Sequence, residues 1–420
     1  MKIELISMLV LAVVVAIGFI KKINMGYLAI GVAYILGLAG GLSSKQILSG
    51  FSGSMLVTLL GVTFLFGIAS VNGTLELISN KIIALVGKRT YFIPITLFVL
   101  SAFLSAIGPG HIAIGILMTT FAVYLAVEME INPFATALYA KLGANAGSAS
   151  AIAPAGVLAA NLAEPLGYSG FEVQIFLTTL FSGFIFMLIL YIAYKGYKVS
   201  AENPLKLSDI AKFNREQRIT ILVIGVVVVL SIGLKMDVGL FSFFAASILI
   251  LLKCVDEKKA LKGIPWGTLI LIVGVGMLVS VITDLGGITM ISEFLIGLMT
   301  DKTAVPIIAL TSGILSWVSS TTGVVMPAMF PIAAEIAESM GGASQFNELI
   351  CAITATSFAA AVSPLSTGGA IILSSYSSAT ELSAERQNQL FKTLFLLSVA
   401  NVGLNVLISF TGFFGLFGLM

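Results

Sequence analysis

The sequence predicts an all-α polytopic membrane protein made of two inverted repeats, and three observations support this prediction. Of the 420 residues, 58% are hydrophobic and 10% are charged, whereas soluble domains carry about 25% charged residues. Long apolar stretches recur along the whole chain, and a segment of roughly 20 apolar residues crosses a bilayer as a helix. The order of these stretches and of the breaks within them occurs twice.

Ten stretches are long and apolar enough to be expected as spanning helices. They cover residues 3–20, 26–43, 54–72, 133–162, 171–195, 219–234, 239–253, 267–284, 346–376 and 391–418. The first follows Lys2 and precedes no small-residue cleavage site, which indicates a retained helix rather than a signal peptide. Two more apolar stretches, residues 91–127 and 304–338, are interrupted in the middle. Each is expected to be a re-entrant hairpin or two full spans.

The repeats are expected at residues 1–200 and 219–420, joined by a loop at residues 201–218. LSAIGPGHIAIG, which begins at residue 104, aligns with LSWVSSTTGVVM, which begins at residue 315. Each repeat has five spanning helices, one of them broken, and a re-entrant helical hairpin. Because five crossings is an odd number, the second repeat must be inverted relative to the first. Inverted repeats with paired broken helices are typical of secondary transporters.

Basic residues in the loops predict the orientation. Lys21 and Lys22 lie in the first loop, while residues 195–218 and 253–264 hold six and four Lys or Arg residues. With the spans above, all three loops fall on one face, which we expect to be the cytoplasm. Both termini then lie outside. We expect the protein in the cytoplasmic membrane of a bacterium or an archaeon.

Four polar breaks carry the candidate site. Backbone groups exposed by a break inside the bilayer survive only within protein or beside a watery cavity. The N-terminus of a half-helix suits a carboxylate or phosphate, and unwound carbonyls suit a cation such as Na⁺. In each half, a hairpin tip and the break in the following helix are expected to meet. The expected substrate-binding residues are His111, Asn145, Ser148, Ser150, Ser319, Ser320, Thr321, Thr322, Ser363, Ser366 and Thr367, with Pro154 and Pro364 at the breaks.

These small polar residues and two ionisable residues have alternative interpretations. Gly, Ser and Thr also mediate close helix packing in membranes. His111, the one histidine of the chain, is a candidate proton carrier or substrate ligand, or a neutral residue that stabilises the hairpin. Lys141 is a functional candidate because intramembrane charges are rare, but its side chain could also snorkel to the headgroups.

The composition disfavours several other classes of protein. One histidine and few carboxylates at membrane depth argue against an intramembrane enzyme. A net charge of +2 gives no reason to expect nucleic acid as a partner. Cys254 and Cys351 have no motif spacing and are expected to be free thiols. Glycine-rich breaks also build channel filters, so an anion channel is the less favoured alternative.

The tip SSTTGVVMP (319–327) resembles the Ser-Asn-Thr signature of the divalent anion/sodium symporters of the ion transporter superfamily. GSASAIAPAG (147–156) and AVSPLSTGG (361–369) resemble the breaks in that family's following helices, and SPLSTGGAI is most similar to the malonate and dicarboxylate carrier branch. Ser319 and Thr321 keep the outer positions of the signature, but Ser320 replaces its asparagine. In the first half the signature falls on residues 108–110, which have no side-chain ligands.

The resemblance implies a homodimer that works as an elevator-type transporter. It implies scaffold helices within 1–72 and 219–284, amphipathic arms at 74–88 and 286–299, and a mobile transport domain that holds the hairpins (91–127, 304–338) and the broken helices (133–162, 346–376). Each repeat ends with a last helix, at 171–195 or 391–418. It implies no cofactor other than Na⁺ as a coupling ion. The Na⁺ ligands would be Gly108, Pro109, Gly110, Asn145, Ser319, Thr321 and Ser363.

The sequence therefore predicts a secondary active transporter for a small organic anion, coupled to Na⁺ or H⁺. The dicarboxylate specificity comes from the resemblance alone, because no arginine lies near either break. A carrier for a monocarboxylate such as gluconate or lactate, or for an oxyanion such as arsenite, remains the alternative.

Overall fold

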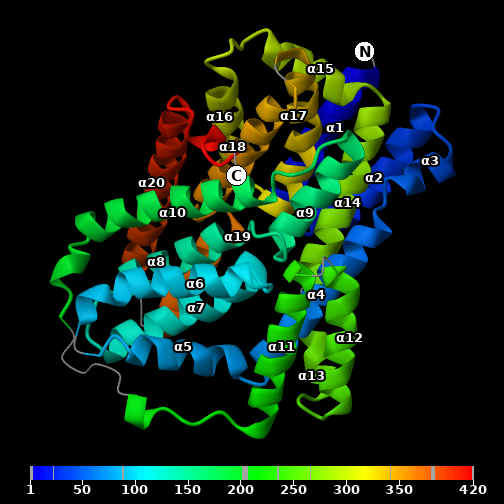
Figure 1. The fold of residues 1–420 in the computed structure, drawn as a ribbon. Coiled ribbons are helices and arrows are strands. Elements are labelled where there is room, and N and C mark those ends of the chain that lie inside the picture. The colour runs from blue at the N-terminus through cyan, green and yellow to red at the C-terminus, as the bar shows by residue number, and fades with distance from the viewer. Residues whose placement is uncertain are drawn as a thin grey trace.

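The structure is a computed structural model that describes residues 3–21, 23–87, 89–200, 207–233, 236–264, 266–340, 342–379 and 384–418. Every regular element within these ranges is a helix (Figure 1), which confirms the predicted all-α class. Helices α1–α10 form the first half of the chain and α11–α20 form the second. In both halves, early helices are followed by an amphipathic arm, then by a helical hairpin, a broken helix and a last long helix. Short 3₁₀ segments lie at Thr90–Phe92, Glu164–Leu166, Gly196–Lys198, Leu207–Asp209 and Phe413–Gly415.

The early helices of the two halves pack against each other on one side of the molecule (Figure 1). Helix α2 packs on α14, and α4 packs on α12. The bounds are α1 (Ile3–Lys21), α2 (Met25–Ala39), α3 (Ser44–Ser49), α4 (Gly53–Val71), α11 (Arg215–Gly233), α12 (Val238–Leu251), α13 (Glu257–Lys262) and α14 (Trp266–Asp284).

Glycines bring these helices into backbone contact at equivalent positions of the two halves. A Cβ atom on Gly26 would lie 2.4 Å from the Ile270 carbonyl oxygen, and one on Gly274 would lie 2.4 Å from that of Gly26. The other crossing uses Gly61 and Gly239, where a Cβ on Gly61 would lie 2.2 Å from the Gly239 carbonyl oxygen. Gly26 and Gly239 are each the second residue of their helix, and Gly61 and Gly274 are each the ninth. Small residues allow this close approach in membrane proteins, and their repetition relates the two halves.

A sharp turn after α4 and after α14 begins each amphipathic arm. Gly73 and Gly286 take φ values of 75° and 77° and start α5 (Thr74–Ala84) and α15 (Gly287–Ile296). This left-handed backbone conformation is one that only glycine adopts readily. The axes of α14 and α15 differ by 78°, so the arm leaves the direction of the preceding helix.

All four breaks expected from the sequence are present. In the first half they separate α6 (Ile93–Ala106) from α7 (Gly110–Glu128), and α8 (Pro133–Gly147) from α9 (Pro154–Ala163). In the second half they separate α16 (Ala304–Trp317) from a π-helical turn (Thr321–Val325) with α17 (Met326–Met340), and α18 (Ala343–Ala360) from α19 (Thr367–Ala379). Each half ends with a long helix, α10 (Glu172–Ala193) or α20 (Ala384–Ser409).

Within the described residues, five helices are long and apolar enough to cross a membrane by themselves, or six if the bent pair of α14 and α15 counts as one span. This is fewer than the ten expected spans, because α2 and α12 have 15 and 14 residues and a broken helix divides its span between two short pieces. Helices of this length need a partner segment to cover roughly 30 Å of hydrocarbon.

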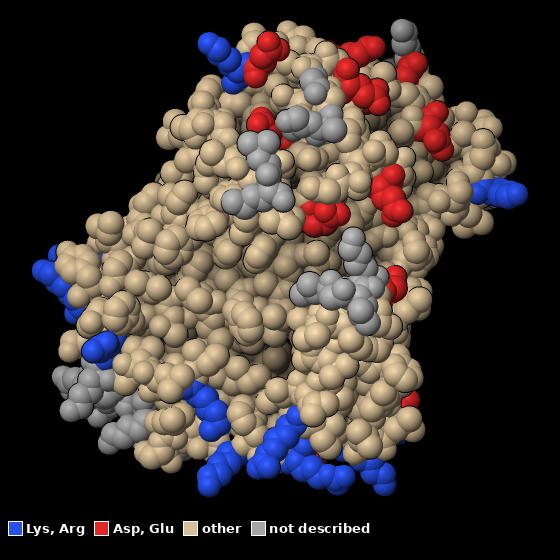
Figure 2. Space-filling view, viewed as in Figure 1, with Lys and Arg blue, Asp and Glu red and all other residues tan. Residues whose placement is uncertain are grey.

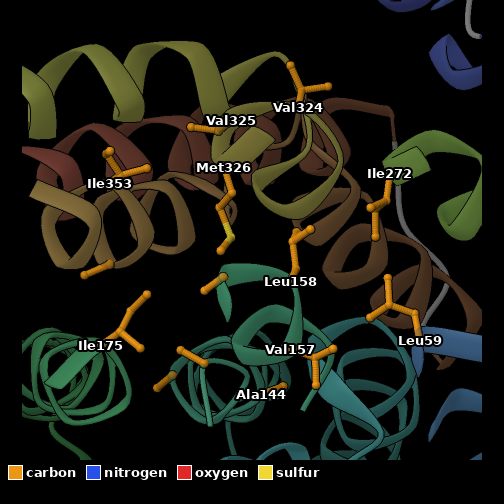
Figure 3. Close-up of a cluster of buried hydrophobic side chains, with 14 of the residues drawn as sticks. Leu59, Ala144, Val157, Leu158, Ile175, Ile272, Val324, Val325, Met326 and Ile353 are labelled. Carbon is orange, nitrogen blue, oxygen red and sulfur yellow. The ribbon is translucent and has the colours of Figure 1, made fainter. Parts of the chain in front are cut away.

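The hydrophobic core continues between the halves (Figure 3). Val157 and Leu158 of α9 lie on one side, and Val324 and Met326 of the second hairpin lie on the other. All four side chains are at most 5% exposed. The break of each half is therefore held against apolar side chains of the other half.

Charged side chains gather at opposite ends of the face seen in Figure 2. Lys and Arg line the lower edge, where Figure 1 places α5 and α13, while Asp and Glu line the upper edge near the N-terminus. This distribution agrees with the charge asymmetry that the loops predicted.

Candidate functional site

Two glycines shape the tip of the first hairpin. Gly108 has a φ of 147° and Gly110 a φ of 73°. A Cβ on Gly108 would lie 1.9 Å from the Phe66 ring of α4, and one on Gly110 would lie 2.8 Å from Cδ of Pro154 at the start of α9. Any larger residue would be strained at either position. The helix breaks here because the tip must turn tightly between α4 and α9.

Serine side chains tie the first tip to the break in the next helix. Ser105 Oγ donates to the Ala144 carbonyl oxygen at 2.7 Å, and Ser150 Oγ donates to that of Ala106. The His111 ring lies with Nδ1 3.0 Å from Ser148 Oγ. The bonds from Ser105 and Ser150 satisfy carbonyl groups near the helix ends, and the contact between His111 and Ser148 joins the tip to the same break.

The second tip is held in a similar way. Ser316, which aligns with Ser105, donates to the Ser357 carbonyl oxygen at 2.8 Å, and Thr321 Oγ1 donates to the same oxygen at 3.1 Å. Ser319 Oγ donates to the Leu315 carbonyl oxygen at 2.6 Å. Ser320 Oγ accepts a bond of 3.1 Å from the Gly323 amide and so caps the π-helical turn.

The second broken helix is stabilised within its own turn. Ser366 Oγ lies 2.8 Å from the carbonyl oxygens of both Ala361 and Ser363, to which it can donate. Ser363 Oγ accepts from the Leu365 amide at 3.2 Å. Pro364 packs closely against Gly369, where a Cβ would lie 2.6 Å from the proline nitrogen. Thr367 then begins α19 at an exposed position.

One small cavity gathers residues from both tips and both broken helices. Of the residues expected to bind substrate, it is lined by His111, Ser319, Ser320, Thr321, Ser366 and Thr367, together with Lys141. Its volume of about 20 Å³ is room for roughly one water molecule. In this conformation the space between these residues is therefore smaller than an organic anion.

A larger cavity of about 460 Å³ adjoins the small one, because His111 and Ile112 line both. Clefts that bind small molecules usually measure about 300–1,000 Å³. Its walls come from α4, the first tip, α14 and the end of α13 at Lys262. Helix α13 lies at the edge where Lys and Arg gather (Figures 1 and 2). Pro109, Pro154 and Thr322 lie here rather than in the small cavity. The Thr322 hydroxyl is buried without a hydrogen-bond partner among the described residues.

Asn145 belongs to a different polar cluster, which the sequence reasoning missed. Its Nδ2 donates to the Phe358 carbonyl oxygen at 3.1 Å, and its side chain lines a cavity of about 10 Å³ with Ser182 and Asn401. Ser182 Oγ donates to Oδ1 of Asn405 at 2.6 Å. We call Asn145, Ser182 of α10, and Asn401 and Asn405 of α20 the α10–α20 cluster. The sequence carried a signal for this cluster, because Asn401 and Asn405 lie four residues apart in the apolar helix α20. Polar groups inside a membrane need partners.

The Na⁺ ligands implied by the family resemblance are gathered in one half only. Na⁺ suits unwound carbonyls and hydroxyls, and Thr321 Oγ1 lies 3.2 Å from Ser316 Oγ beside the shared Ser357 carbonyl. The donor types at the second tip therefore fit Na⁺. The first tip does not gather its implied ligands, because Asn145 faces the α10–α20 cluster and not Gly108, Pro109 and Gly110. Within the described residues, no group of His, Cys, Asp and Glu has the arrangement of a metal site.

Comparisons with known proteins point to a membrane transporter and not to an enzyme. Residues 1–148 match the family described as the N-terminus of the dicarboxylate carrier protein MatC. This match confirms the resemblance to the malonate and dicarboxylate carriers over that part of the chain. A comparison with curated proteins found no match. The fold is similar to the crystal structure of the YdaH transporter of Alcanivorax borkumensis, with a TM-score of 0.56, 12% identity, and coverage of 87% of this chain and 86% of that one.

Proposed function

We propose that this chain, a membrane transporter whose first part matches dicarboxylate carriers, moves a small organic anion across the membrane by secondary active transport. The substrate class we favour is a dicarboxylate. The observation that carries the proposal is the convergence of two hairpin tips and two broken helices on one small polar cavity. Breaks at membrane depth are expensive unless they serve a site, and transporters place their substrate sites at such interfaces.

The two adjoining cavities support alternating access. The larger cavity extends from Lys262 to the first tip, while six of the residues expected to bind substrate line the small cavity next to it. An elevator-type movement would carry the hairpins and broken helices past the early helices of the two halves, with α5 and α15 as connecting arms. We place the basic face in the cytoplasm, as the loop charges favour, with both termini outside and two copies forming a homodimer.

Coupling to Na⁺ has its best support at the second tip. Ser319, Thr321 and the Ser357 carbonyl supply neutral oxygens there, whereas residues 108–110 of the first tip have no side-chain oxygen. Coupling to H⁺ instead would involve His111, whose ring lies at the boundary of the two cavities. These alternatives differ in one measurement, the dependence of uptake on a Na⁺ gradient at constant pH.

Monocarboxylates and oxyanions remain alternative substrates for the same cavity, and a channel is an alternative of another class. The described walls of the small cavity carry one ammonium group and hydroxyls, which suit carboxylates and oxyanions alike. Purified protein in liposomes separates these cases. We expect saturable uptake and counterflow of a C3–C5 dicarboxylate, with weaker competition by lactate, gluconate and arsenite. An ohmic current without counterflow would contradict the proposal.

A further inference from the structure

Lys141 is the one lysine or arginine among the described residues that line the small cavity. It extends from α8 and is 1% exposed. A Cβ on Gly115 of α7 would lie 2.8 Å from its Nζ, and one on Gly368 of α19 would lie 2.9 Å from its Cε. The two glycines thus leave space for the side chain between the first hairpin and the second broken helix. Lys141 does not reach the surface, so the snorkelling alternative is wrong for this conformation.

The ammonium group of Lys141 has an incomplete set of partners. Among the described residues its one hydrogen bond goes to the His111 carbonyl oxygen, at 3.1 Å. No Asp or Glu lines the cavity. An ammonium has three donors, and a buried charge without an opposite charge is strongly disfavoured. The described wall of the cavity therefore offers no carboxylate to pair with the Lys141 nitrogen when it is charged.

The groups around Lys141 would complement an anion. Ser319, Ser320 and Thr321 bring hydroxyls from the second tip to the same cavity. Ser366, Thr367 and Gly368 bring the first turn of α19, whose 13 residues make it long enough to have a helix dipole. The N-terminal end of a helix favours negative charge. The hydroxyl groups, the helix end and the ammonium thus face one space.

We propose that Lys141 is the charged ligand of the substrate carboxylate in this cavity, and that it gives the site its selectivity for anions. This inference deepens the proposed function and rests on it. In the conformation described here the His111 carbonyl oxygen accepts a hydrogen bond from the ammonium group. When the cavity opens, a carboxylate would accept hydrogen bonds from Nζ and from hydroxyl groups of the second tip. One ligand would then bridge the first broken helix and the second hairpin.

The test uses the full-length protein, purified and reconstituted, with malonate and succinate as probes. Lys141→Met keeps most of the length of the side chain and removes its charge. Lys141→Arg keeps the charge. Gly115→Ala keeps Lys141 but displaces Nζ, because the added methyl group meets the flexible end of that side chain. The measurements are binding affinity from anion-dependent thermal shifts, uptake into liposomes, and the melting temperature without anion.

We expect Lys141→Met to weaken binding of the transported anion by about 10- to 100-fold, the loss typical of one hydrogen bond to a charged group. Gly115→Ala should weaken it less, and Lys141→Arg should retain part of the affinity. Without anion, Lys141→Met should melt no lower than the unmodified protein, because it removes a buried unpaired charge. This last result separates ligand binding from a structural role.

The opposite pattern would overturn the inference. If Lys141→Met melted lower without anion but bound it with unchanged affinity, Lys141 would only hold the His111 carbonyl. In that case the proposed transport function would stand, since uptake by the unmodified protein is measured separately. If the unmodified protein bound and transported neither carboxylate, nor gluconate, lactate or arsenite, both the proposed function and the role of Lys141 would fall.

Discussion

Replacing Gly108 with alanine should disable the first hairpin tip. Gly108 has a φ of 147°, and strain at such a backbone position costs roughly 1–3 kcal/mol for other residues. The added Cβ would lie 1.9 Å from the ring of Phe66, which is 3% exposed, and overpacking of this kind costs roughly 1–3 kcal/mol. We therefore expect Gly108→Ala to lower the free energy of unfolding by about 2–6 kcal/mol and to abolish most uptake.

Two comparisons separate the contributions to this effect. Gly41 also has a positive φ, of 83°, but nothing lies within 4 Å of its added Cβ, so Gly41→Ala should cost only about 1–2 kcal/mol. Phe66→Ala removes the clashing ring, so its combination with Gly108→Ala should cost about 1–3 kcal/mol less than the sum of the single changes. The assay is denaturant unfolding in detergent, with uptake in liposomes. Equal costs for Gly41→Ala and Gly108→Ala, with strict additivity for Phe66→Ala, would refute the described geometry of the tip.

Three further changes test other parts of the site. Ser366→Ala removes the hydroxyl that lies against two carbonyl oxygens of the second break and should destabilise the protein by about 1–3 kcal/mol. The control Ser374→Ala, at an exposed site, should change stability by about 0.5 kcal/mol or less. Equal effects of the two changes in thermal unfolding would count against the role of Ser366. Asn401→Ala removes the hydrogen bond of 3.2 Å to the Ala359 carbonyl oxygen and should lower the free energy of unfolding by about 1–3 kcal/mol. An unchanged free energy of unfolding would show that the α10–α20 cluster is dispensable for stability. His111→Gln should flatten the dependence of uptake on pH between about 5 and 8 if His111 carries the coupled proton, and an unchanged pH profile would exclude it.

The sequence predicted the architecture better than it predicted the site. The positions of three of the four breaks follow from local chemistry, because Gly108, Pro154 and Pro364 cannot continue a regular membrane helix without cost. The direction of a side chain depends on how helices rotate against one another, which local patterns do not reveal. Asn145 thus faces Ser182 and Asn401 instead of the first tip.

Lys141 shows the same difference between local pattern and packing. Its position within an apolar segment identified it as a candidate, but the sequence left its direction open. The space that it occupies depends on Gly115 and Gly368, which lie on helices from different halves of the chain. No local pattern pairs these glycines with the lysine, so only the packed structure places its ammonium in the small cavity.

The most direct measurement is a cryo-electron microscopy structure of the protein in lipid nanodiscs with a saturating concentration of the anion that it transports. We expect density for the anion within hydrogen-bond distance of Lys141 and of hydroxyl groups at residues 319–321, so that both halves contact a single ligand. Anion density confined to the α10–α20 cluster, or to the large cavity without contact to the second tip, would contradict the account.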